Sequence, residues 1–165
     1  MKKLLLGVIC GFLATAVQAN PKFIGGMVEL GVTTQGVLSQ KMKRFKCKAT
    51  QTFNRKGENM TIIPGRCIKD IPYMYETHVV FARPGEAKSV IFMLEPSREA
   101  FQYWIDEVTR SYGRPDWKQS DMNFWKVRAE KTRITVINHE AEGFCFISFD
   151  WEGTYASTPK PSRRY

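Results

Sequence analysis

Apolar residues between Ser97 and Gly113 recur with the spacing of an amphipathic helix. Five of them fall on one stripe of a 3.6-residue helix: Phe101, Trp104, Ile105, Val108 and Tyr112. Ser97 can accept a hydrogen bond from the free amides of the first turn, and Gly113 followed by Pro115 ends the helix. A stripe this wide needs an apolar sheet face to lie on, so we expect the rest of the chain to be organised around this helix.

Strand-like segments, rich in β-branched and aromatic residues, lie on both sides of the helix. We predict strands at 76–82, 88–94, 123–130, 132–138 and 143–151, and strand-like pieces between 48 and 67 around a turn at 54–57. The first two are joined by a tight turn at 83–86, and they form the clearest hairpin of the first half.

A second, weaker helix is predicted to begin at Thr33 or Thr34. Its apolar positions are Val37, Leu38, Met42 and Phe45. Gly36 costs this helix about 1 kcal/mol relative to alanine. The preceding segment, 20–31, is apolar but interrupted by glycines, so no regular element is predicted there.

Together these elements predict an α+β fold: an antiparallel sheet with two helices on one face. The order helix and strands, then helix and strands, permits two α-β-β-β half-repeats that share one sheet. This order is similar to that of the tandem folds of some secreted bacterial proteinaceous inhibitors. No motif is shared with those proteins, so the similarity concerns element order and implies nothing about function.

The two ends of the chain differ in composition from the segment between them. Residues 1–19 have two lysines, an apolar stretch and a small-residue cleavage site, which is the layout of a secretory signal peptide. An uncleaved membrane anchor is the alternative, but an apolar stretch of about fourteen residues is short for a span of roughly twenty. We therefore expect a single α+β domain at 20–152, a disordered basic tail at 153–165 and a periplasmic or secreted location.

Positive charge dominates the sequence. The formal net charge is +9, and it falls to +7 once the signal peptide removes two lysines and no acid. This balance favours an acidic protein or an anionic envelope polymer as partner, although the charge also serves solubility. Nucleic-acid binding is a further alternative because of the basic cluster at 41–48 and the basic tail. Export of the protein argues against this alternative.

Three cysteines remain after the predicted cleavage. Export places them in an oxidising compartment, and the polar, turn-rich segment between Cys47 and Cys67 favours a disulfide between these two. Cys145 lies between two phenylalanines in an apolar strand and is predicted to be buried, the alternative being a reactive or intermolecular thiol.

Motifs of known catalytic classes are absent from the sequence, and no cofactor or metal site is predicted. His78 is interpreted as a strand position. His139 lies beside Glu140 and Glu142, an arrangement that serves general base catalysis or metal binding and leaves a small exported hydrolase as the alternative function.

Basic and aromatic residues gather on the strands that follow the main helix. If 130–131 is the turn, Arg128 faces Arg133 and Lys126 faces Thr135, on the sheet side away from the helix. Phe124 shares that side, and Trp117 in the preceding loop is expected to be exposed. The predicted binding residues are Lys126, Arg128, Arg133, Trp117 and Phe124, and the function is non-enzymatic binding or inhibition in the envelope; a merely solvated basic face is the alternative.

Overall fold

The structure of the protein is a computed structural model that describes residues 20–54, 56–68, 71–82 and 85–153. The predicted signal peptide at 1–19 and, except for Gly153, the predicted tail lie outside the described residues.

The described chain contains two α-helices, ten strands and three short 3-10 helices. In order they are β1 (Lys22–Phe23), β2 (Val28–Glu29), α2 (Gln35–Arg44), β3 (Thr50–Phe53), β4 (Asn59–Pro64), η1 (Gly65–Cys67), β5 (Met74–Phe81), β6 (Ala87–Leu94), α3 (Arg98–Tyr112), β7 (Trp117–Lys118), β8 (Met122–Val127), η2 (Arg128–Glu130), β9 (Thr132–His139), η3 (Glu140–Glu142) and β10 (Phe144–Trp151).

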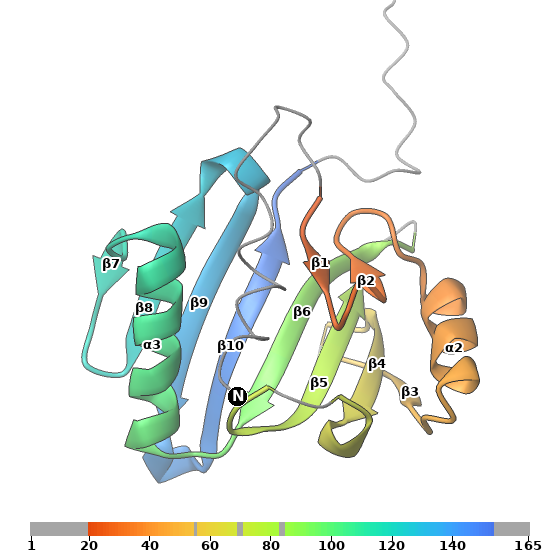
Figure 1. The fold of residues 1–165 in the computed structure, drawn as a ribbon, viewed down its shortest axis with the longest axis horizontal. Coiled ribbons are helices and arrows are strands. Elements are labelled where there is room, and N and C mark those ends of the chain that lie inside the picture. Colours follow the sequence, from red (N-terminus) through yellow and green to blue (C-terminus); the bar gives the residue numbers. More distant parts are fainter. Residues whose placement is uncertain (1–19, 55, 69–70, 83–84, 154–165) are drawn as a thin grey trace, which may run out of the picture.

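Eight of these strands form one antiparallel sheet in the order β3-β4-β5-β6-β10-β9-β8-β7. The predicted α+β class is confirmed. Each half of the sheet is a helix followed by four strands in a meander, and the last strands of the two halves, β6 and β10, pair at the centre (Figure 1). The half-repeat is therefore α-β-β-β-β, because β3 and the two-residue β7 extend the predicted three-strand units.

Helix α3 has the predicted caps and packs through the predicted stripe. The Ser97 hydroxyl accepts a hydrogen bond from the Ala100 amide, and Gly113 follows the last turn with a φ of 85°. Phe101, Trp104 and Val108 are buried against the second half of the sheet. Burial of three large apolar side chains contributes several kcal/mol, which makes α3 the main anchor of this half.

Helix α2 begins at the predicted cap, Thr34, but its packing is narrower than predicted. Leu38 and Met42 are buried, whereas Val37 and Phe45 are 44% and 67% exposed, so only two of the four apolar positions with helical spacing lie in the core. The reason is the position of α2 at the side of the sheet, where it contacts β4 with one row of residues only.

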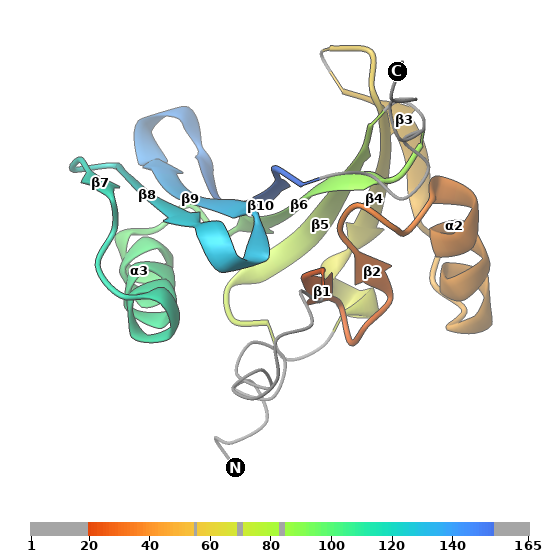
Figure 2. The ribbon, with the colours of Figure 1, turned by 90° about the horizontal axis from the view of Figure 1, so that it is seen from above.

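A hairpin of β1 and β2 fills the space between the two helices, in a segment for which no regular element was predicted. Phe23 and Val28 from this hairpin are buried, and the Phe23 ring lies 4.7 Å from the ring of Phe149 in β10. Figure 2 shows α2, α3 and this hairpin on the same side of the sheet. The described part of the chain leaves the other side of the sheet uncovered (Figure 2).

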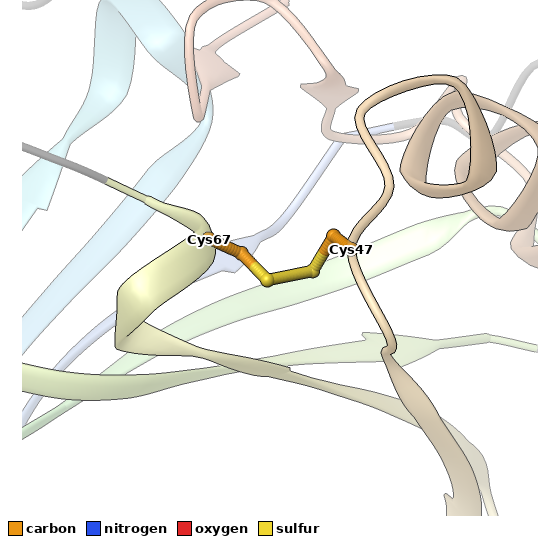
Figure 3. The surroundings of a disulfide bond; sticks show 2 residues. All are labelled: Cys47 and Cys67. Atoms are coloured by element: carbon orange, nitrogen blue, oxygen red, sulfur yellow. A yellow bond between two sulfur atoms is a disulfide. The ribbon is translucent and has the colours of Figure 1, made fainter.

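The predicted disulfide between Cys47 and Cys67 is confirmed (Figure 3). It ties the segment after α2 to the short helix η1 after β4, with 5.7 Å between the two Cα atoms. Cys145 is a free, buried cysteine, as predicted.

Candidate binding face

The register of the strands defines a set of residues on the sheet side opposite the helices, here called the open face. Core residues such as Val90, Ile134 and Ile147 point toward the helices, so their strand neighbours point away. One complete row of cross-strand partners on the open face runs through all eight strands: Thr50, Ile62, His78, Ile91, Ser148, Thr135, Phe124 and Trp117.

A hollow of about 430 Å³ lies at the β7–β9 end of the open face. Its lining residues are Trp117, Met122, Phe124, Arg133 and Thr135. Trp117 is 45% exposed, in agreement with the sequence expectation, and it stands opposite Phe124 in the register of β7 and β8. The structure therefore brings three of the five predicted binding residues, Trp117, Phe124 and Arg133, around one open concavity.

Two cations border this hollow. Lys126 stands directly opposite Arg133 on the open face, and both residues are exposed. The Arg133 guanidinium lies 3.6 Å from a carboxylate oxygen of Asp150. Within the described residues, no carboxylate oxygen lies within 4.0 Å of the Lys126 ammonium. Like charges placed directly opposite each other destabilise a strand pair, so this arrangement favours an anion above it.

The predicted pairing of Arg128 with Arg133 is wrong, and so is that of Lys126 with Thr135. Strand β8 ends at Val127, and residues 128–130 form the 3-10 turn η2 instead of continuing the strand. Lys131 closes this turn in the left-handed conformation, with a φ of 48°. The partners are consequently Lys126 with Arg133 and Val127 with Thr132, while Arg128 lies exposed in the turn.

Asp150 in β10 fixes the position of Arg133. Its carboxylate accepts hydrogen bonds from the hydroxyls of Ser89, at 2.8 Å, and Ser148, at 3.2 Å. These bonds come from two strands and hold the carboxylate beside Arg133. Asp150 and Met122 were not predicted for the site, although alternation along the strands places them on the open face; only the strand order shows that they lie near Arg133 and Thr135.

The two histidines lie on the open face as well, each near one carboxylate. His78 Nε2 lies 2.6 Å from Glu76 Oε1 on the same strand, which agrees with its interpretation as a strand position. His139 Nδ1 lies 3.6 Å from Asp121 Oδ2, and the residues proposed for the hydrolase alternative, Glu140 and Glu142, form the exposed 3-10 turn η3. Within the described residues, no group of three or more metal-ligating side chains comes together.

The basic cluster at 41–48 has partners of its own. The Lys41 ammonium donates a hydrogen bond to the Met27 carbonyl at 3.0 Å, and Lys41, Lys43 and Arg44 occupy the last turn of α2. Cations in the last turn interact favourably with the helix dipole, so local structure already explains part of this cluster.

Comparison of the chain with models of protein families, with curated proteins and with solved structures found no match. Among the described residues, no helix has the length and the apolar character needed to span a bilayer. The chemistry of the open face is therefore the main indication of function.

Proposed function

We propose that the protein is an exported, non-enzymatic binding or inhibitory protein that takes an acidic protein or an anionic envelope component on its open face. The observation that carries this proposal is the juxtaposition of Lys126 and Arg133 beside the hollow lined by Trp117 and Phe124. Cations give electrostatic attraction and orientation, and the adjacent aromatic rings supply apolar contact area.

The repulsion between charges on the open face supports the binding role. Lys126 bears a charge with no carboxylate partner in the described residues, opposite a second cation, and this costs stability in the free protein. An anionic group placed above the pair removes the repulsion and gains two attractive interactions. Arg133 also has Asp150 of β10 as a neighbour at 3.6 Å, and the same side chain lines the hollow.

Export is the second part of the proposal. A signal-peptide layout at residues 1–19 and a disulfide between Cys47 and Cys67 both support an oxidising compartment outside the cytoplasm. In Gram-negative bacteria this compartment is the periplasm, where acidic proteins and anionic polymers are accessible.

A charge-matched pair of variants tests the binding role, with poly-L-glutamate as a defined anionic probe. Lys126→Glu/Arg133→Glu reverses two charges on the open face. Lys43→Glu/Arg98→Glu reverses two exposed charges on α2 and α3, which cover the other side. Both variants have the same net charge, so long-range attraction is equal.

We expect the open-face variant to bind labelled poly-L-glutamate about tenfold more weakly than the matched control at low salt, a difference of about 1.4 kcal/mol. Fluorescence anisotropy measures both affinities. Equal affinities of the two variants would show that the probe responds to net charge and not to this face.

A further inference from the structure

The open face extends beyond the hollow, and apolar residues on it occur on strands as far away as β4. Antiparallel sheets commonly have one solvated face on which polar residues alternate with the buried ones. Here the uncovered side carries partly or fully exposed apolar side chains on six of the eight strands: Met60, Ile62, Ile91, Met93, Phe144, Phe146, Ile137, Phe124, Met122 and Trp117. Four of them, Met93, Phe146, Ile137 and Met122, are successive cross-strand partners from β6 to β8, and an exposed apolar patch of this kind marks an interaction site.

The strands that carry these side chains span a large part of a protein interface. Neighbouring strands lie about 4.8 Å apart, so the distance from β4 to β8 is about 24 Å, and six residues of a strand span about 20 Å. The product is roughly 480 Å² in projection, more than half of the roughly 800 Å² per partner of a standard protein–protein interface.

The charges on the face are unevenly distributed. On the β4–β6 side Glu76 is paired with His78, and at the centre Asp150 is hydrogen-bonded to two serines and lies 3.6 Å from the Arg133 guanidinium. The cation without a carboxylate partner in the described residues, Lys126, lies at the β8 end. A complementary partner is therefore acidic opposite β8 and β9 and apolar opposite β10 and β6.

We infer that the open face binds a folded protein with an acidic patch beside an apolar one, through one interface that reaches from the hollow to β4. This inference rests on the proposed function, and it selects a protein over an anionic polymer or a lipid headgroup. A headgroup or a small anion would occupy the hollow only, because Phe124 in β8 and Ile62 in β4 are five strand spacings, about 24 Å, apart.

Charge disfavours two other occupants of the face. The C-terminal segment 154–165 has three basic residues, Lys160, Arg163 and Arg164, and no acid, so its charge has the same sign as that of Lys126 and Arg133. A second copy of the chain also has a net charge of +9, or +7 without residues 1–19, and it opposes association for the same reason.

Site-specific photocrosslinking in the cells that make the protein tests this inference. Benzoylphenylalanine replaces Phe124 in one variant and Ile62 in another, and Arg98 on α3 in a control that faces away from the open face. A fourth variant carries the crosslinker at Met93 in β6, which gives an independent reading if the Ile62 variant does not fold. Mass spectrometry identifies each adduct.

The expected result is the same partner polypeptide crosslinked from Phe124, Ile62 and Met93, no such adduct from Arg98, and a yield at least fivefold lower when Lys126→Glu/Arg133→Glu is added. Adducts from Phe124 alone, adducts with a second copy of the chain or with a non-protein component, or no adduct above the Arg98 control would overturn the inference. Of these, an adduct confined to Phe124 that still depends on Lys126 and Arg133 leaves the proposed function intact. If the charge reversal leaves the yield of the Phe124 adduct unchanged, the proposed function itself is contradicted.

Discussion

Lys126 on β8 and Arg133 on β9 are direct cross-strand partners on the side of the sheet that no described element covers. A strand pair of this kind is destabilised by like charges. The chain thus holds two cations together at a cost in stability, and this juxtaposition is the basis of the binding role proposed here.

Removal of one of the two cations should stabilise the free protein. We expect Lys126→Gln to raise the free energy of unfolding by about 0.2–1 kcal/mol at low ionic strength, and the gain should shrink in high salt. Urea denaturation at two salt concentrations measures it. The matched control is Lys118→Gln, because Lys118 is also exposed but stands opposite Asn123. An equal gain in both variants would attribute the effect to net charge.

Loss of the disulfide should destabilise the first half of the sheet. Cys47 and Cys67 are separated by 20 residues, and opening a loop of this length costs about 3 kcal/mol in the chain-entropy model. Thermal unfolding of Cys47→Ala/Cys67→Ala should therefore begin at a clearly lower temperature than that of the wild type. A reductant should lower the melting temperature of the wild type and leave that of the double variant unchanged. If the reductant lowers the melting temperature of both proteins, its effect does not come from this disulfide.

The thiol of Cys145 should be unreactive in the folded protein. Cys145 is fully buried, and burial raises its pKa to about 11. Ellman's reagent at pH 8 should react with this thiol only after denaturation. Rapid reaction of the native protein would contradict the buried placement.

The raised pKa of Cys145 also predicts how the stability of the protein changes with pH. Between about pH 9 and pH 11 the unfolded state releases a proton that the folded thiol retains, so the free energy of unfolding falls as pH rises. Tyrosines also titrate in this range. Comparison of the wild type with Cys145→Ala therefore separates the contribution of the thiol from that of the tyrosines. The pH-dependent loss should be smaller in Cys145→Ala than in the wild type; equal losses would mean that the thiol titrates alike in both states.

Two glycines with similar backbone conformations should respond differently to alanine. Gly31 and Gly26 have φ values of 74° and 83°, which disfavour a side chain at both positions by about 1–2 kcal/mol. At Gly31 a Cβ atom would also lie 2.6 Å from Nε1 of Trp151, whereas at Gly26 it would meet nothing within 4 Å. We expect Gly31→Ala to destabilise the protein by about 1–3 kcal/mol more than Gly26→Ala, as overpacking does. Equal costs in urea denaturation would show that Trp151 moves aside freely.

Local patterns in the sequence were sufficient for the elements with strong periodicity. The stripe and caps of α3, the cap of α2 and the pairing of Cys47 with Cys67 depend on neighbours in sequence or on short loops, and these predictions are confirmed. The exposure of Phe45 was not predictable, because α2 and α3 have similar spacing and only the position of α2 at the side of the sheet leaves its second row uncovered.

The cross-strand pairs of the candidate site could be predicted from the sequence only in part. Alternation placed Lys126, Arg133 and Phe124 on one side, but the register depended on a turn that begins earlier than predicted, at Arg128. This two-residue difference moves the partner of Arg133 from Arg128 to Lys126 and leaves the side chains on the predicted side of the sheet. The position of Ile62 and Phe124 in one row of cross-strand partners depends on β6 pairing with β10, a contact between the two halves that no local signal encodes.

The most direct test is a map of the residues that respond to the anionic probe. In a titration of isotope-labelled protein with poly-L-glutamate, followed by amide and indole resonances, the largest shifts should occur in β7, β8 and β9, including the indole of Trp117. Shifts concentrated instead on α2 and the basic segment 41–48, with β8 and β9 unaffected, would contradict the proposal that the open face is the binding surface.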